Sequence, residues 1–492
     1  MRITSTFRLM LFPVLNVLGM IVAGFSLTTL IPYVLSLWKE DGASEGFLIT
    51  FGIAFITGGL MWFLTRSFKR ELIPRDGFLL VTLAWVSLAV IASIPLYLSI
   101  PDTTFSQALF EATSGITTTC ATIYSGLDHL PFSINFWRCF LAWLGGIGIL
   151  VMAVAVLPLL GVGGAQIFRA ETSGPLKEGK LTPRIADTAK AFYLIYLATS
   201  AVCALTFHFL GMDWGDAIMH MFTTVSLGGF SSHDASFAYW SSQALNYAAI
   251  IFCLISGVNF TVHFLAWRNL SLKVYVKDTE VKAWIFTACF ISFVVMCILV
   301  VNGTYTKLSD AFYYAFTNTV FAVSTSGFAN TNYGSWPLTA QLLMLLGSCF
   351  ATCAGSTGGG IKMIRFIAMI KQGGLEFKRI LHPRMVKPVI IGGRVISNQV
   401  IFSVLAFLLM YIAVLVLSTL YFLVSGLDGL TSFSTAMSCL NNLGPALGTL
   451  GPAYNFSSLS DHLVYFCCAL MVLGRLELLT VLVLFTRAFW RA

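Results

Sequence analysis

Long apolar runs follow one another almost from end to end of this chain and constrain its fold more than any other feature. A bilayer-spanning helix needs about 20 apolar residues, and ten segments qualify: roughly 9–36, 46–65, 77–99, 133–161, 188–210, 241–267, 283–302, 337–370, 398–424 and 461–489. Only 10% of the residues are charged, against about 25% in soluble domains. We therefore predict an all-α integral membrane protein. The first run is too long for a signal-peptide core and lacks a small-residue cleavage site, so we expect a retained helix.

Basic residues gather on one side of this predicted membrane topology. Of the 29 Lys and Arg, 25 lie in six segments: 1–8, 65–76, 168–190, 267–282, 362–394 and 487–491. The positive-inside rule places these segments and both termini in the cytoplasm. The opposite loops hold 12 acids and 3 bases, which either concentrates cations at a pore entrance or reflects ordinary solvated loops. The net charge of +8 follows this topology, and we expect no nucleic-acid partner.

The last eight apolar runs pair into four similar units, each with a half-length segment and a loop between its two helices. The half-length segments are about 104–117, 213–225, 308–323 and 427–439, too short to span and too polar to face lipid. Irregular backbone at membrane depth is tolerated only inside protein or beside water. We therefore predict four pseudo-fourfold helix–pore-loop–helix repeats around a central pore, plus two extra N-terminal helices. The expected boundaries are 1–70 for the N-terminal pair and 71–165, 166–272, 273–380 and 381–492 for pore repeats 1 to 4.

A loop with a shared pattern follows each half-length segment. The four loops, here called the filter loops, read Thr118-Thr119-Cys120, Leu227-Gly228-Gly229, Thr325-Ser326-Gly327 and Asn442-Leu443-Gly444. Twelve residues before each loop's last position stands a small residue: Ala108, Ala217, Ala315 and Ser432. Converging backbone carbonyls replace the water shell of a cation in selectivity filters, and glycine accepts unusual backbone angles most easily. We predict that these loops bind a permeating cation, with ordinary glycine turns as the alternative.

Four acids lie in or near the half-length segments. Asp216, Asp310 and Asp428 fall near the N-terminal ends, where an acid complements the helix dipole. We favour that role for them over direct ion binding. Glu111 lies mid-segment, and both bracing and pore lining stay open for it.

A glycine-rich run, Gly355-Ser356-Thr357-Gly358-Gly359-Gly360, interrupts the segment 337–370. Glycine costs about 1 kcal/mol relative to alanine inside a helix, so this run predicts a break. A nucleotide phosphate loop would end in Gly-Lys-Ser/Thr, which is missing here. We predict a gate below the filter loops, with Lys362 beside it. Because intramembrane charges usually face a cavity or a partner, we expect Arg475 to reach this break and help set the gate; a snorkelling or locally paired arginine is the alternative.

On these motifs the chain resembles the Trk/Ktr/HKT superfamily of cation transporters, most closely its bacterial TrkH/TrkG-type potassium-uptake subunits. The motifs are residues 114–122, 153–161, 224–231, 355–362 and 473–477. The resemblance implies potassium as the transported ion, no organic cofactor, and a homodimer with one pore per protomer. It also implies a bacterial inner-membrane location and a cytosolic ring of TrkA-type nucleotide-binding subunits docked on the basic face.

Cys120 departs from the family pattern, which generally has glycine in all four loops. Because serine in the first repeat is associated with sodium permeation in some plant members, a sodium-permeable or sodium/proton-coupled transporter (a symport) stays open. A membrane enzyme such as a lipid or sugar transferase is a third possibility. It would need acids, His or Arg clustered near one membrane face, whereas these loops offer mainly Gly, Ser, Thr and Asn, so we expect no enzyme. The 11 cysteines and 7 histidines show no zinc-ligand spacing.

Overall fold

The computed structural model describes residues 2–68, 72–155, 181–350 and 352–490. Several sequence-based predictions lie partly outside the described residues: the ends of the span 133–161 and of the motif 153–161, parts of the basic segments 1–8, 65–76, 168–190 and 487–491, one residue of the segment 337–370, and the borders of pore repeat 1 with its neighbours. In the described part, seven helices are long and apolar enough to cross a membrane, and two bent helix pairs also pass as broken spans. The predicted all-α membrane fold is confirmed.

The N-terminal pair of spans and the first two pore units contain most of the long straight helices. The pair consists of α1 (Arg2–Ser26), η1 (Leu27–Thr29), α2 (Leu30–Lys39) and α3 (Ser44–Thr65). The first pore unit contains α4 (Pro74–Ser99), α5 (Phe105–Ile116), η2 (Leu127–His129) and α6 (Phe132–Ala155). The second contains α9 (Leu181–Phe209), α10 (Trp214–Val225), η3 (Ser236–Tyr239), α11 (Gln243–Ser256) and α12 (Phe260–Asn269).

The third and fourth units follow the short helix α13 (Lys273–Lys277). The third contains α14 (Thr279–Val301), α15 (Leu308–Val323), η4 (Tyr333–Ser335), α16 (Leu338–Gly347) and α17 (Met363–Leu381). The fourth contains α18 (Asn398–Val424), α19 (Gly429–Asn441), η5 (Gly448–Leu450), η6 (Phe456–Ser458), α20 (Asp461–Arg475), α21 (Leu479–Leu482), η7 (Val483–Phe485) and α22 (Arg487–Trp490). All four predicted half-length segments are therefore helices with nearly the predicted bounds.

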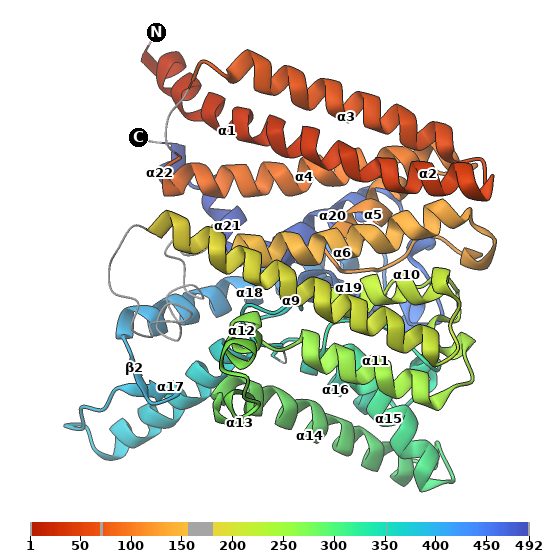
Figure 1. The fold of residues 1–492 in the computed structure, drawn as a ribbon. Coiled ribbons are helices and arrows are strands. Elements are labelled where there is room, and N and C mark those ends of the chain that lie inside the picture. The colour runs from red at the N-terminus through yellow and green to blue at the C-terminus, as the bar shows by residue number, and fades with distance from the viewer. Residues whose placement is uncertain (1, 69–71, 156–180, 351, 491–492) are drawn as a thin grey trace.

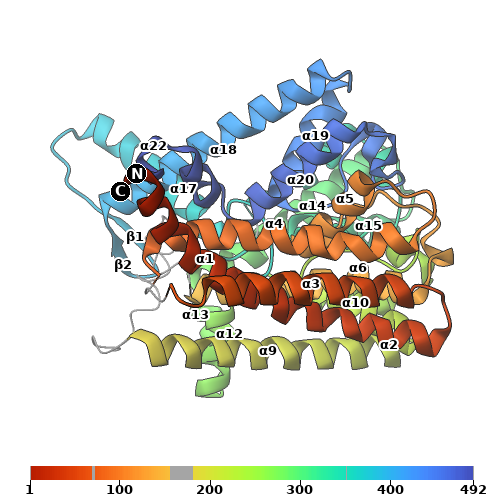
Figure 2. The ribbon, with the colours of Figure 1, turned by 90° about the horizontal axis from the view of Figure 1, so that it is seen from above.

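The spanning helices run side by side, and α17 lies at the same end as the start of α1 and the end of α22 (Figures 1 and 2). That end also carries an antiparallel hairpin, β1 (Val389–Ile391) and β2 (Arg394–Ile396), which the sequence pattern did not predict. Its two turn residues, Gly392 and Gly393, both have positive φ, as two-residue hairpin turns of type I′ require. The hairpin lies between the third and fourth units.

Two of the predicted spans are bent helix pairs rather than single helices. The segment 241–267 is two helices, α11 and α12, bent by 92°, and the segment 461–489 is bent by 107° between α20 and the helices that follow it. The segment 337–370 is broken, as the glycine-rich run predicted, into α16 and α17. The returning helix is therefore bent in the second and fourth units and interrupted in the third.

Close packing without side chains joins the two N-terminal spans. A Cβ on Gly58 of α3 would lie 2.6 Å from the amide nitrogen of Ala23, and a Cβ on Gly19 of α1 would lie 2.7 Å from the carbonyl oxygen of Gly58. Small residues let helix backbones approach in this way in membranes, where association depends on packing. Gly59, the next residue of α3, has no neighbour within 4 Å of its Cβ position.

This contrast gives a matched pair of substitutions. Gly58→Ala should lower the thermal unfolding temperature of the detergent-solubilised protein, because overpacking costs about 1–3 kcal/mol. Gly59→Ala should leave it unchanged or raise it slightly, because alanine is the better helix former. Equal behaviour of the two variants would contradict the close contact between α1 and α3.

Candidate functional site

Four short helices point their C-terminal ends at the four filter loops. The helices are α5, α10, α15 and α19, and each ends one or a few residues before its loop. The small residues aligned from the sequence are completely buried: Ala108, Ala217, Ala315 and Ser432. The carbonyl ends of four helix dipoles therefore face one region of the protein, which favours a cation there.

Each filter loop has a left-handed backbone at the same two positions. At the first residue, φ is 54° for Thr118, 56° for Leu227, 62° for Thr325 and 54° for Asn442. At the third residue, φ is 54° for Cys120, 96° for Gly229, 70° for Gly327 and 103° for Gly444. Alternation of positive and negative φ brings successive peptide groups to one side of the chain. The four loops thus share one backbone shape. Unrelated glycine turns would not be expected to share it.

The middle amide of each loop bonds back to its own pore helix. The donor and acceptor are always five residues apart: Thr119 N to Ser114 O at 2.9 Å, Gly228 N to Thr223 O at 2.8 Å, Ser326 N to Phe321 O at 3.0 Å, and Leu443 N to Ser438 O at 2.9 Å. These hydrogen bonds tie each loop to the end of its own short helix.

Neighbouring filter loops touch in cyclic order. A Cβ on Gly229 would lie 1.6 Å from Ser326 O, a Cβ on Gly327 would lie 2.1 Å from Leu443 O, and a Cβ on Gly444 would lie 2.8 Å from Thr119 O. In each contact the third residue of one loop meets the middle carbonyl of the next. Loops 2, 3, 4 and 1 are thereby joined in sequence around a common axis.

Cys120 closes this ring in a different way. A Cβ on Gly228 would lie 2.9 Å from Cys120 Sγ, so the thiol occupies space that a side chain in the middle of loop 2 would need. The thiol is buried, with 9% of the residue exposed. Gly228 is the only one of the four middle residues without a side chain. The cysteine and this glycine are therefore complementary in size.

A cavity of about 100 Å³ lies over the filter loops and is lined by all four units. Its lining includes Cys120, Gly229, Gly327 and Pro445, which come from units 1, 2, 3 and 4 respectively. We call this cavity the vestibule. Arg138, His233 and Asp234 are among its polar lining residues.

A buried ion pair braces the first loop beside the vestibule. Glu111 accepts hydrogen bonds from Arg138 Nε at 2.7 Å, Thr122 Oγ1 at 2.9 Å and the amide of Ile123 at 2.9 Å. Both charged side chains are completely buried. Arg138 also donates to the carbonyl of Ser231 at 3.2 Å, which ties loop 1 to the segment after loop 2. Of the two roles left open for Glu111, the contacts support bracing.

The acids at the helix starts differ in what they do. Asp428 caps α19, accepting a hydrogen bond from Thr431 N at 3.1 Å, and Asp310 lies in the first turn of α15. Asp216 lies in the first turn of α10, but the cap of that helix is Asp213. Asp216 instead accepts hydrogen bonds from Ser232 Oγ at 2.6 Å and His233 Nε2 at 3.0 Å.

His233 stands on the rim of the vestibule between two carboxylates. Its other ring nitrogen pairs with Asp128, and its ring stacks on Tyr239 with centroids 3.6 Å apart. Partial burial acts to lower the pKa of His233, but the hydrogen bonds to Asp216 and Asp128 outweigh it and raise the pKa above the ordinary value. The rim is therefore a compact charged cluster rather than a set of freely solvated acids.

The glycine-rich loop, residues 355–360, crosses directly beneath the filter loops and contacts three pore units there. Thr357 Oγ1 donates to Val225 O at 3.0 Å, at the end of α10. Gly359 N donates to Thr325 Oγ1 at 2.9 Å, and a Cβ on Gly359 would lie 1.9 Å from Asn441 O. The loop has no room there for larger residues.

Two buried cations hold this loop. Arg475 donates to Thr357 O at 2.8 Å and to Gly145 O at 3.3 Å, so the predicted contact with the break is confirmed. Lys362 Nζ donates to Gly358 O. Glu477 pairs with Arg365, which excludes local pairing of Arg475 with Glu477. The role of Arg475 and Lys362 in gating stays a prediction.

The sequence pattern missed the parts that surround the glycine-rich loop. The break between α11 and α12 bonds to it, with Phe260 N donating to Gly355 O at 3.1 Å and Cys353 N to Gly257 O at 3.0 Å. Two residues could have predicted this break: Gly257, and Asn259, which is the N-cap of α12. The break after α20 has left-handed backbone at Glu477 and Leu478, residue types that give no such signal.

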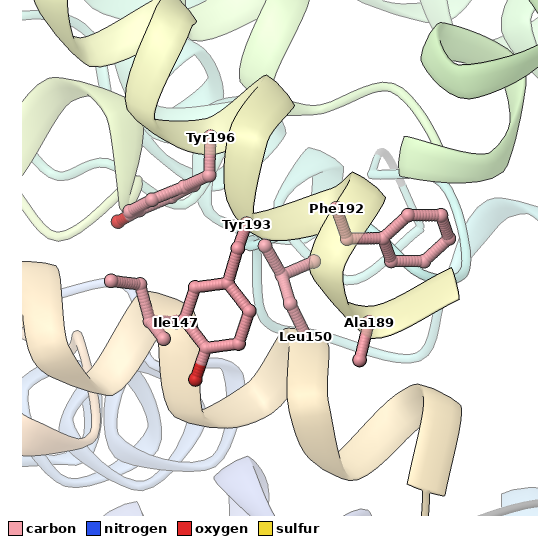
Figure 3. Close-up of a pocket in the computed structure, with 6 residues that line it drawn as sticks. All are labelled: Ile147, Leu150, Ala189, Phe192, Tyr193 and Tyr196. Carbon is pink, nitrogen blue, oxygen red and sulfur yellow. The ribbon is translucent and has the colours of Figure 1, made fainter. Parts of the chain in front are cut away.

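Two further features of the described residues bear on other kinds of site. No group of three or more His, Cys, Asp or Glu there could hold a metal ion. A cavity between α6 and α9 measures about 10 Å³ and is lined by Ile147, Leu150, Ala189, Phe192, Tyr193 and Tyr196 (Figure 3). Since a water molecule needs about that much room, this apolar cavity is a packing gap.

Known proteins resemble the chain over almost its whole length. The model of the family TrkH, described as "Cation transport protein", matches residues 43–491. The "Trk system potassium uptake protein TrkH" of Vibrio parahaemolyticus is 42% identical, covering 97% of this chain and 99% of that protein. The corresponding TrkG of Escherichia coli is 37% identical, covering 97% and 98%. The "Crystal Structure of the Potassium Transporter TrkH from Vibrio parahaemolyticus" has a TM-score of 0.90 at 41% identity, covering 98% of this chain and all of that one.

The size complementarity between loops 1 and 2 can be tested by a double substitution. Gly228→Ala should lower the thermal unfolding temperature, because the new methyl group meets Cys120 Sγ. Cys120→Gly should recover part of that loss, with a coupling of about 0.5–3 kcal/mol, as expected for residues in contact. Gly126→Ala is a poor comparison because its φ is positive, so Gly148→Ala, with a nearest contact of 3.6 Å, serves as control. Additive effects of the two substitutions would contradict the contact.

Proposed function

We propose that this chain, which belongs to the TrkH family of cation transport proteins, is the pore-forming subunit of a potassium-uptake system. As a family member with several apolar spans, it is a multi-pass membrane protein. Potassium is supported by the relatives, which are named potassium uptake proteins. The transported ion is the substrate, and we propose no organic cofactor.

The observation that carries the proposal is the cyclic contact of four loops with one backbone shape. A cation that leaves water needs several oxygen atoms at once, and converging carbonyls supply them. The proposed ion-binding residues are the twelve of the filter loops. Each loop offers carbonyls on the inner side because its middle amide bonds outward. The vestibule, with Asp128, Asp216 and Asp234 around it, would supply cations to this ring.

The glycine-rich loop is the proposed gate. It lies where an ion that has passed the filter loops must go, and it is held by contacts to Val225, Thr325 and Arg475. Its glycines let the chain pass close to Asn441 and leave it free of the packing that fixes a regular helix. The proposed gate residues are Gly355, Ser356, Thr357, Gly358, Gly359, Gly360, Lys362 and Arg475.

The proposed assembly is a homodimer in the bacterial inner membrane, regulated by a cytosolic nucleotide-binding ring of the TrkA type. The end of the molecule with α17 and the hairpin supports this orientation, since it carries exposed basic residues: Lys371, Lys378, Arg384 and Lys387. Both termini are proposed to lie on that side. The pore repeats keep their proposed boundaries, 71–165, 166–272, 273–380 and 381–492.

Sodium permeation is the second candidate, and Cys120 is the observation that favours it. Its thiol brings bulk into a ring in which the other three third residues are glycine. A change in the spacing between loops 1 and 2 would alter the number of oxygens that reach the ion. Ion coupling to sodium or protons belongs to this candidate.

Exchange of this residue tests the choice of ion. Cys120→Gly should raise the preference for potassium over sodium by about tenfold, since about 1.4 kcal/mol corresponds to that factor. The readouts are growth of potassium-uptake-deficient cells and ion flux into proteoliposomes. Cys289→Ser, at an exposed cysteine of α14, is the matched control. Unchanged selectivity would show that position 120 does not discriminate, and equal sodium and potassium flux in the parent would overturn the potassium proposal.

Shortening of the glycine-rich loop tests the gate. Deletion of residues 355–360 should raise the ion leak from proteoliposomes, because it removes the segment beneath the filter loops. Gly373→Ala and Gly374→Ala change glycines of α17 that have no neighbour within 4 Å of their Cβ positions, and they should leave the leak unchanged. A leak that stays at the parent level after the deletion would remove the gate assignment.

A further inference from the structure

Glu280 is a buried carboxylate at the start of α14. Only 1% of this residue is exposed, and a carboxylate taken out of water is costly unless it is hydrogen-bonded. Its Oε1 accepts two backbone hydrogen bonds, from Ala354 N at 2.7 Å and from Ile364 N at 3.0 Å. Neither the filter loops nor Arg475 accounts for these contacts.

The two amides lie at opposite ends of the glycine-rich loop. Ala354 immediately precedes Gly355, and Ile364 lies in the first turn of α17, shortly after the loop. One oxygen atom therefore holds the beginning and the end of the same loop. Backbone hydrogen bonds also join the two flanks of the loop, from Met363 N to Thr352 O at 2.9 Å and from Ile361 N to Cys349 O at 2.7 Å. Glu280 adds a link that comes from a different helix.

Glu280 also accepts a hydrogen bond from the first turn of α17, a helix whose own N-cap residue makes no side-chain capping bond. The residue at the N-cap position of α17 is Lys362, and its side chain makes no capping hydrogen bond. The first amides of a helix need an acceptor, and a negative charge near them is favourable. Glu280 supplies both from a different helix, so α14 and α17 are linked by this one side chain.

The start of α14 lies beside a polar cleft at the end of the molecule that carries the hairpin. The cleft measures about 190 Å³, and Lys277, Thr279, Gly392 and Arg394 are among the residues that line it. Glu280 follows Thr279 directly, so the cleft wall and the link to the loop are consecutive residues. A displacement of this end of α14 would pull on both ends of the loop at once.

We propose that Glu280 is a positioning residue that latches the glycine-rich loop in its place beneath the filter loops. This latch rests on the proposed gate. With the carboxylate in place, the loop stays against Val225 and Thr325. When α14 moves at its cytoplasmic end, both bonds to Glu280 are released together, and the loop is held only by its remaining contacts, such as those of Arg475 and Lys362. Glu280 touches no ion in this scheme.

Substitutions of Glu280 in the full-length protein test the latch by rubidium efflux from proteoliposomes. Glu280→Ala should raise the leak about tenfold. This is the factor by which the equilibrium between the held and the released loop shifts when a hydrogen bond to a charged group is lost. Glu280→Gln should raise it less, because the amide oxygen still accepts. Asp278→Asn removes a charge from the same end of α14 without touching the loop and should not change the leak.

Combination with the loop deletion separates the latch from the gate. In a protein without residues 355–360, Glu280→Ala should add no further leak, and the rubidium-to-sodium flux ratio should stay at the parent value throughout. If the deletion raises the leak but neither Glu280 variant does, the latch is wrong and the gate stands. If the deletion itself has no effect, the gate fails and the latch with it.

Two further results also decide against the latch. An equal rise of the leak in the parent and in the deleted background would show general destabilisation, as would a changed flux ratio. Where Glu280→Ala yields no folded protein by size-exclusion chromatography, the isosteric Glu280→Gln carries the test, and an unchanged leak in that variant overturns the latch.

Discussion

At three of the four boundaries between neighbouring filter loops there is no room for a side chain, and the geometry of the pore centre depends on this contact. The third residue of one loop meets the middle carbonyl of its neighbour, at Cβ distances of 1.6 to 2.8 Å for Gly229, Gly327 and Gly444. Every loop is also hydrogen-bonded to its own pore helix. A shift of one helix would therefore move its loop and, through the contact between loops, a carbonyl of the next loop. The close contact between loops therefore constrains the four short helices and their buried small residues. It also constrains the Glu111–Arg138 pair.

A second constraint comes from the cations beneath the ring. Arg475 and Lys362 are buried and donate to carbonyls of the glycine-rich loop. A buried charge that loses its acceptor is strongly unfavourable unless water replaces it. Movement of the loop must therefore bring water to these two side chains. In the proposed gate, the same movement would open a path and hydrate it.

The sequence predicted the fold best where the length or the composition of a segment is subject to a physical limit. Helix length against bilayer thickness located the spans, and the four half-length segments were recognisable because no spanning helix is so short. The glycine-rich run predicted a break in the helix because glycine has a low helix propensity. In contrast, the bend after α20 involves Glu477 and Leu478 in left-handed backbone, which tertiary contacts such as the Arg365–Glu477 pair stabilise. Glu280 was equally hidden, because its partners are amides of residues 74 and 84 positions away, and a backbone amide has no signature in sequence.

The position of the cysteine follows from the same ring. At φ of 54°, Cys120 lies inside the small left-handed region that side chains other than glycine tolerate. Gly229 and Gly444 have φ of 96° and 103°, outside that region, and Gly327 has a carbonyl oxygen 2.1 Å from its Cβ position. Only the first loop combines an accessible φ with a neighbour, Gly228, that leaves space for a thiol. At the third position of these loops, a residue larger than glycine is therefore compatible with the fold in the first loop alone.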